Sequence, residues 1–291
     1  MENPLQSYYR HKEIFVKLPT KAKWMSNPPE LTPDGEIGVR PMTVSDELLL
    51  TIPDALYNGE SMFNLIESVC PDMGDAREIM LPDVDVILLA SRATSFEKTF
   101  PVSATCTHCE ANQMFDIDLQ SVLGKVTMIT EETEVEIDGL VVEMRPNSLK
   151  ALTASNIKGS ETARLLASIK GQEDLENINK KEEYVQGLQQ IAAANIVLVA
   201  DAIIKVTMPD GNEVTDTQHI IDWLSNTNRK TLDVLTNQQR LMNTNGIPKI
   251  FDFTCGEEDC AKVFNAEVEF NPSFFFTKSF DYSQPLKTST N

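Results

Sequence analysis

Short stretches in which apolar and polar residues alternate occur along much of the chain, and this alternation predicts β-strands. Three Asp-Gly pairs, Asp34-Gly35, Asp138-Gly139 and Asp210-Gly211, lie beside such stretches. An Asp-Gly pair favours a tight hairpin turn because both residues tolerate the positive φ angles that the turn requires. We therefore expect hairpins between Glu30 and Arg40, between Val135 and Met144, and around the third pair.

Other segments place apolar residues three and four positions apart, which is the spacing of one helix face. Residues 43–100 contain several such runs, including a helix that starts at Pro82-Asp83. A proline and a carboxylate both suit the first turn of a helix. Residues 149–206 are expected to be mainly helical, followed by helices at 217–224 and 229–243. Helical segments together with short antiparallel hairpins define an α+β fold.

Four of the five cysteines lie in two short knuckles, and each knuckle precedes a stretch with strand alternation. Two residues separate Cys106 from Cys109, and four separate Cys255 from Cys260. Paired cysteines in a chain without a secretory pattern are more often metal ligands than disulfide partners. We expect the four thiolates to bind structural Zn²⁺ in a closed tetrahedral site, which makes the knuckles two halves of a split zinc ribbon.

The cysteine pairs also allow other interpretations. The ribbon can fold with four reduced thiols and no metal. A thioredoxin-like redox role for Cys106 and Cys109 is disfavoured, because the pair precedes a strand and not a helix whose N-terminus would lower a thiol pKa. A metalloenzyme would need an open coordination position, which four cysteine ligands do not leave. The fifth cysteine, Cys70, is expected to be an ordinary buried or half-buried residue.

The knuckles enclose residues 110–254, and this separation sets the expected domain organisation. Closing so long a loop costs about 4 kcal/mol plus a constant, whereas structural zinc contributes about 10–16 kcal/mol in small zinc fingers. A metal can therefore hold the ends of a folded insertion together. The expected parts are an extended basic N-terminal arm at 1–42, a helical segment at 43–100, a split zinc ribbon at 101–124 and 247–276, an inserted mainly helical domain with hairpins at 125–246, and a polar C-terminal tail at 277–291.

The charge of the chain bears on its partners. The formal charge is −19, from 25 basic and 44 acidic side chains, so we expect repulsion from nucleic acid and anionic membranes. Residues 1–25 differ, because five Lys or Arg side chains stand there against Glu2 and Glu13. We expect this basic arm either to dock on an acidic partner or to be a solvated terminus. No stretch approaches the roughly 18 apolar residues of a membrane span, and the first residues lack the apolar region of a secretory signal.

Sequence motifs of common enzyme classes do not occur. The HExxH, GxxxxGK(S/T), GxGxxG and GxSxG patterns are all missing from the sequence. The three histidines, His11, His108 and His219, are too scattered to nominate a general base. We therefore expect a binding or assembly protein that is not an enzyme and that has no small-molecule substrate.

Several short motifs follow one another in an order that extends over residues 8–276. They are Tyr8-Tyr9-Arg10, Val16-Lys17-Leu18-Pro19-Thr20, Pro41-Met42-Thr43, the helical run from Asp85 to Arg92, Cys106 and Cys109 followed by Phe115-Asp116-Ile117, Val142-Glu143-Met144-Arg145-Pro146, Asn228-Arg229, the Cys255 and Cys260 knuckle, and Asn271-Pro272-Ser273-Phe274-Phe275. In this order they resemble the motifs of the T-even-type contractile-tailed phage (myovirus) baseplate hub assembly protein family. The sequence departs from the family at Lys21-Ala22, where a glycine is expected, and in the wider second knuckle.

The resemblance implies a structural or chaperone-like assembly protein of the phage tail baseplate hub, acting through contacts with other baseplate and tail proteins. Such a protein would occur in the host cytoplasm during assembly, and in the virion if it stays in the tail. The expected partner-binding residues are Tyr8, Tyr9, Arg10 and Lys17 in the arm and Phe280 after the last strand. The alternative function is a zinc-ribbon adaptor of nucleic-acid machinery, which the acidic residues beside both knuckles disfavour.

Overall fold

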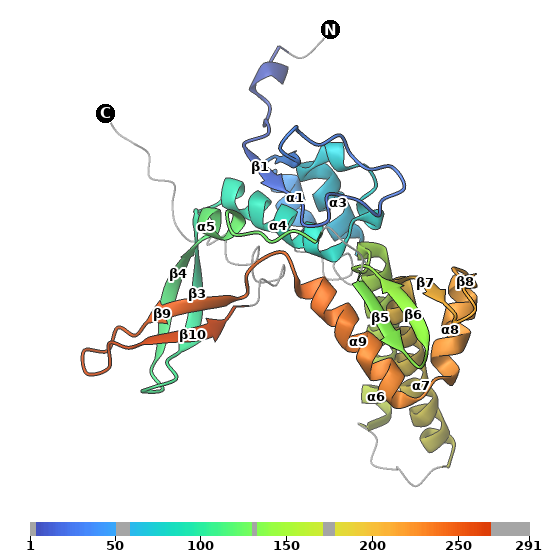
Figure 1. The fold of residues 1–291 in the computed structure, drawn as a ribbon. Helices are drawn as coiled ribbons and strands as arrows, with labels where there is room; N and C mark the ends of the chain where they lie inside the picture. Colours follow the sequence, from blue (N-terminus) through green and yellow to red (C-terminus); the bar gives the residue numbers. More distant parts are fainter. Residues whose placement is uncertain (1–3, 51–58, 130–132, 171–177, 269–291) are drawn as a thin grey trace, which may run out of the picture.

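The structure, a computed structural model, describes residues 4–50, 59–129, 133–170 and 178–268. These residues form two lobes with separate apolar cores, and a pair of hairpins extends from the first lobe (Figure 1). Helices and antiparallel strands together confirm the α+β class. In chain order, the elements are η1 Gln6–Tyr8, β1 Ile14–Lys17, β2 Glu36–Val39, α1 Val44–Leu50, α3 Glu60–Val69, η2 Pro71–Met73, η3 Ala76–Glu78, α4 Leu81–Ser95, β3 Thr99–Thr105, β4 Asn112–Asp118, α5 Leu119–Leu123, β5 Thr133–Ile137, β6 Leu140–Met144, α6 Leu149–Lys170, α7 Ile178–Asp201, β7 Ile203–Thr207, β8 Glu213–Val214, α8 Thr217–Asn226, α9 Arg229–Thr244, β9 Ile250–Thr254 and β10 Val263–Glu267.

The strands of the described residues form three two-stranded sheets, β1–β2, β3–β4 and β9–β10, and one four-stranded sheet in the order β5-β6-β7-β8. All of these pairs are antiparallel. The expected turn at Asp138-Gly139 joins β5 to β6, with φ angles of 52° and 79°. The turn at Asp210-Gly211 joins β7 to β8, where Gly211 has a φ of 85°. Both hairpin predictions are confirmed.

The hairpin expected between Glu30 and Arg40 was wrong. Strand β2 pairs with β1, so that Ile14 lies opposite Val39, and no strand forms directly before the turn at Gly35. Three prolines occupy the segment before this turn. Because proline has no backbone N–H to donate, that segment is poorly suited to a strand. The turn itself is present, and Gly35 adopts a φ of 76°.

The helices of the second lobe follow the sequence closely, with one exception. The predictions at 217–224 and 229–243 are confirmed by α8 and α9. The helical region expected to reach Val206 ends at Asp201 instead, and Ile203–Thr207 forms β7. Strand β7 is rich in β-branched residues, which pack well on a pleated surface. Pairing with β6, where Val206 lies opposite Val142, decides the outcome against the helix.

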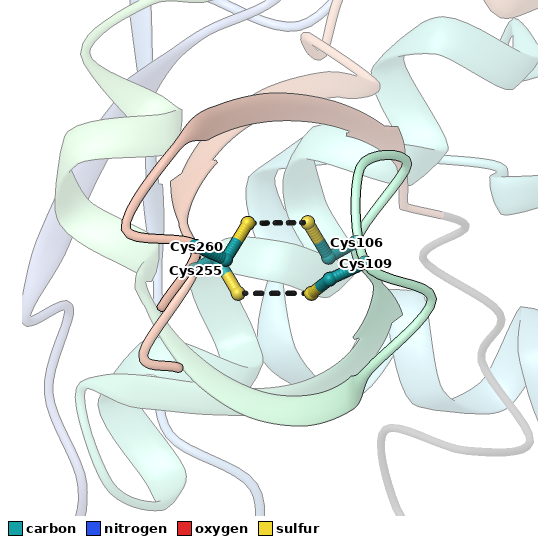
Figure 2. Close-up of side chains that lie close together, drawn as sticks. All are labelled: Cys106, Cys109, Cys255 and Cys260. Carbon is teal, nitrogen blue, oxygen red and sulfur yellow. Dashed lines mark hydrogen bonds between the residues drawn. The ribbon is translucent and has the colours of Figure 1, made fainter. Parts of the chain in front are cut away.

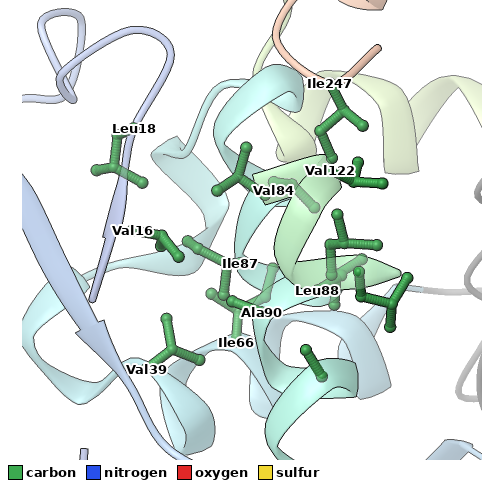
Figure 3. Packing of buried hydrophobic residues seen from close by; sticks show 14 of the residues in the cluster. Val16, Leu18, Val39, Ile66, Val84, Ile87, Leu88, Ala90, Val122 and Ile247 are labelled. Atoms are coloured by element: carbon green, nitrogen blue, oxygen red, sulfur yellow. The ribbon is translucent and has the colours of Figure 1, made fainter. Parts of the chain in front are cut away.

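Helix α4 runs through the core of the first lobe and is buried on almost all sides (Figure 3). Val16 of β1, Val39 of β2, Ile66 of α3 and Val122 of α5 pack in the same cluster. Burying one such side chain contributes about 1.5–3 kcal/mol. The strand pair β1–β2 is therefore an integral part of the lobe, and the exposed Tyr8 and Tyr9 lie before it in the chain.

The two lobes are joined by backbone hydrogen bonds between the residues around Met80 and the residues around Asn147. The backbone N–H of Leu81 donates to the Asn147 carbonyl at 3.0 Å, and the N–H of Leu149 donates to the Ile79 carbonyl at 2.8 Å. The side chain of Asn147 is fully buried and hydrogen bonds only to groups of the second lobe. The side chain of Asn147 therefore links the segment that connects the lobes to helices α7 and α9.

Candidate metal centre

Two hairpins bring the four cysteines together. The turn between β3 and β4 carries Cys106 and Cys109, and the turn between β9 and β10 carries Cys255 and Cys260. Figure 2 shows the two turns facing each other, with the cysteine side chains between them. Among the described residues, these four form the one group of potential metal ligands that is close enough to hold an ion, with all four sulfurs within 4.8 Å of one another.

The spacing of the sulfurs fits a tetrahedral metal. The Sγ atoms of Cys106 and Cys260 are 3.9 Å apart, and those of Cys109 and Cys255 are 3.6 Å apart. These distances exclude disulfides, in which the sulfurs are about 2.05 Å apart. Four sulfurs at about 2.3 Å from a central zinc would be separated by about 3.8 Å along each edge of the tetrahedron. Two of the sulfur pairs have about this separation and all four sulfurs lie within 4.8 Å of one another, so the cluster can hold a metal ion.

The two knuckles share a backbone design although their cysteine spacings differ. In each, the N–H of the first cysteine donates to the carbonyl two residues past the second cysteine, at 2.9 Å and 3.0 Å. The residue directly after the second cysteine, Glu110 or Ala261, adopts a positive φ of 60° or 43°. The two extra residues of the second knuckle lie between these fixed points, so the wider spacing does not displace its thiols.

Aromatic and polar contacts also join the hairpins. The ring centroids of Phe115 and Phe253 are 4.6 Å apart, and those of Phe115 and Phe264 are 5.9 Å apart. The side chain of Gln113 accepts from the Gly256 N–H at 2.8 Å and donates to Glu257 at 3.2 Å. Packing thus aligns the hairpins beneath the cysteines, and a metal would act at their tips.

The thiols of the cluster do not ionise alike. Burial opposes the thiolate of Cys106, but hydrogen bonds from the backbone N–H groups of His108 and Cys109 and from the thiols of Cys109 and Cys255 together lower the pKa of Cys106 to about 6. The Ala111 N–H favours the thiolate of Cys109, yet burial and the neighbouring thiols raise its pKa to about 12. Like charges this close resist joint ionisation unless a cation neutralises them. A divalent metal would supply that charge and would release protons on binding.

The expected partner-binding residues have different surroundings. Tyr8 and Tyr9 are 83% and 53% exposed, and Lys17 is exposed on β1. Arg10 instead donates from Nη1 to Asp46 at 2.9 Å and from Nη2 to the Ser68 hydroxyl at 2.6 Å. Its guanidinium therefore anchors the arm to the first lobe. Phe280 lies outside the described residues.

Sequence reasoning missed a second surface feature, an open apolar pocket between α8 and the four-stranded sheet. The signal was present in α8, where Ile220, Ile221, Trp223 and Leu224 are more apolar residues than one narrow helix face can bury. Only Ile220 and Leu224 are fully buried in this helix. The remaining apolar side chains form part of the surface.

Fold and site together define an α+β protein whose distinctive centre is a four-cysteine cluster that joins remote parts of the chain. The family model for T4 bacteriophage base plate protein matches residues 13–276. Because the match covers most of the chain, the protein belongs to this family and has a structural role in the phage baseplate. No curated protein and no solved structure matches the chain. Among the described residues, no helix is both long and apolar enough to cross a membrane.

Proposed function

We propose that the protein builds the hub of a contractile-tail baseplate, as a structural component or a chaperone-like assembly factor, and that it is not an enzyme. Family membership supports the baseplate role, and the motifs between Tyr8 and Phe275 support the hub assignment. Its partners in this proposal are other baseplate and tail proteins. The acidic charge of −19 disfavours nucleic acid as a ligand.

We also propose that Cys106, Cys109, Cys255 and Cys260 bind one structural Zn²⁺. The observation that carries this proposal is the set of sulfur separations, 3.6 Å and 3.9 Å, which match the edge of a zinc–sulfur tetrahedron. In this assignment the site is closed, because four thiolates fill the coordination sphere. The metal then has a purely architectural role, holding the ribbon from which residues 125–246 are inserted.

Metal analysis of the purified protein tests the site. One zinc per chain is expected, together with the absorption of four sulfur ligands after substitution with cobalt. A cobalt spectrum of fewer than four sulfurs would contradict the closed site. Cys70→Ser is a matched control because Cys70 is buried in the first lobe away from the cluster and should leave the metal content unchanged.

Phage assembly tests the hub role. A phage that lacks this protein should accumulate tail precursors without complete baseplates, and the wild-type protein supplied from a plasmid should restore them. Mass spectrometry of purified tails then separates the two forms of the proposal. A fixed number of copies per tail indicates a component, and absence from finished tails indicates an assembly factor. Complete baseplates in the deletion phage would contradict both forms.

A further inference from the structure

An open pocket lies in the second lobe between α8 and the β8 side of the four-stranded sheet. Its volume is about 340 Å³. Val206 and Ile220, which are 5% and 2% exposed, form its buried base. The side chain of His219 is 74% exposed at the mouth. The remaining lining side chains are apolar and partly buried, and they are Leu140, Met208, Val214 and Trp223.

The local structure explains why this apolar surface is left open. Strand β8 contains only Glu213 and Val214, so the sheet ends before it can cover the side of α8. Helix α8 directs Ile220 and Leu224 into the core of the lobe. Trp223, one position from Leu224, is only partly buried and forms a wall of the pocket. Tryptophan in such a position is frequently an energetic centre of protein interfaces.

Acidic side chains flank the pocket in sequence. Asp210, Glu213, Asp216 and Asp222 are all exposed and lie within three residues of residues that line it. The lysine of this segment, Lys205, has its ammonium 2.7 Å from Glu213 and 3.4 Å from Glu143. It therefore neutralises at most one of the four carboxylates, and the surface around the pocket stays acidic. The mouth is therefore an apolar opening in a negative surface, which attracts positive charge.

We propose that this pocket binds a segment of another baseplate protein in which a large apolar side chain stands next to lysine or arginine. The apolar side chain would enter between Trp223 and Ile220, and the basic side chains would meet the carboxylates outside. A volume of about 340 Å³ is at the lower end of the range of roughly 300–1,000 Å³ for ligand pockets. It suits one or two side chains more than a whole helix.

This inference rests on the proposed assembly role, because it assigns a partner chemistry to it. A direct binding test can fail for the pocket without bearing on the assembly role, and so it separates the two proposals. The chain has two tryptophans, Trp24 and Trp223, so Trp24→Phe leaves one reporter in the pocket wall. The full-length Trp24→Phe protein is titrated with three peptides, which have the sequences Lys-Lys-Ile-Leu-Lys-Lys, Glu-Glu-Ile-Leu-Glu-Glu and Lys-Lys-Ser-Ser-Lys-Lys.

The basic apolar peptide is expected to shift the Trp223 emission to shorter wavelength and to bind at least tenfold more tightly than the other two. Its binding should weaken as salt is raised from about 0.05 M to 0.5 M, because the ionic contacts are at the surface. Equal binding of the acidic peptide would overturn the proposal. A shift that depends on protein concentration without peptide would overturn it in favour of a second copy as the occupant.

Two further variants in the same background locate the binding. Val214→Phe fills the pocket and should abolish the emission shift. Glu213→Gln combined with Asp222→Asn removes two rim charges and should weaken the basic peptide several-fold while preserving the lobe. Asp252→Asn combined with Glu267→Gln removes two exposed charges from the β9–β10 hairpin and is the matched control. An equal loss in this control would place the binding elsewhere and leave the baseplate role untouched.

Discussion

Replacing Asn147 by alanine should destabilise the protein far more than the small change in side-chain volume suggests. The Asn147 Nδ2 group donates to the Leu198 carbonyl at 2.7 Å and to Asp201 at 3.0 Å. Its Oδ1 atom accepts from Gln239 and Asn243, each at 2.8 Å. Alanine can replace none of these bonds, and the side chain of Gln239 is buried, with 6% of its surface exposed.

The magnitude follows from the groups that lose a partner. A buried donor or acceptor left without a hydrogen bond costs about 1–3 kcal/mol. Asp201 keeps a contact with the Ser148 N–H at 3.2 Å and Asn243 is less buried, so the main losses fall on Gln239 and the Leu198 carbonyl. Two such losses give about 2–6 kcal/mol. Asn147→Asp should be worse, because it places a second carboxylate beside Asp201 and cannot donate to Leu198.

Urea denaturation followed by far-ultraviolet circular dichroism measures the change in the free energy of unfolding. Asn265→Ala, at an exposed position on β10, serves as the matched control and should change the free energy by less than about 0.5 kcal/mol. The same small effect in Asn147→Ala would refute the reasoning. An Asn147→Asp variant more stable than Asn147→Ala would refute it as well, because the order of the two rests on the donors that the site requires.

Three other predictions concern the cluster, the core and the arm. Cys255→Ser should lose the metal and raise the hydrogen-exchange rate of the ribbon strands. Cys70→Ser should leave the metal content and the exchange rate unchanged. Unchanged exchange of the ribbon strands in Cys255→Ser would contradict the shared site. Burial raises the pKa of Asp83 to about 6, against 3.8 for the ordinary group. The stability that Asp83 contributes is therefore complete below about pH 4 and is lost as the pH rises to about 6. Asp83→Asn should flatten this part of the curve of unfolding free energy against pH. A parallel shift of the curve without a change in slope would disprove the assignment. Deletion of residues 1–9 should preserve the melting temperature and weaken partner association, whereas deletion of residues 1–25 should prevent folding, since it removes β1 from the core.

Local chemistry allowed most elements to be predicted from the sequence. The turn at Asp138-Gly139 was predictable because its two positive φ angles depend on those two residues alone. The partner of β2 was not, since Ile14 and Val39 are far apart in sequence and only the packed core makes them neighbours. The same limit applies to Arg10. Its charge was visible in the sequence, but the four acceptors of its guanidinium lie on Pro41, Asp46 and Ser68, which only folding brings close to Arg10.

The sequence predicted which cysteines form the cluster, but it did not predict how much of the closure of the insertion depends on them. The sequence suggested that a metal holds the ends of the insertion between the knuckles together. In the structure, the Thr127 N–H donates to the Gly246 carbonyl at 2.8 Å, which already brings the two ends of the insertion together. Gly246 has a φ of 115°, and a Cβ atom there would approach Pro19 to 2.9 Å, so this crossing is fitted to glycine.

The closure is therefore shared, and this changes what loss of the metal should do. With residues 127 and 246 already joined, the cysteines close only the short stretches 110–126 and 247–254. Each halving of a loop lowers its closure cost by about 0.6 kcal/mol, so the metal has much less chain entropy to offset than the full insertion implies. We expect a metal-free protein to loosen at β3–β4 and β9–β10 while the four-stranded lobe keeps its protection from hydrogen exchange. Simultaneous loss of protection in both lobes would show that the Thr127–Gly246 crossing cannot hold without the ribbon.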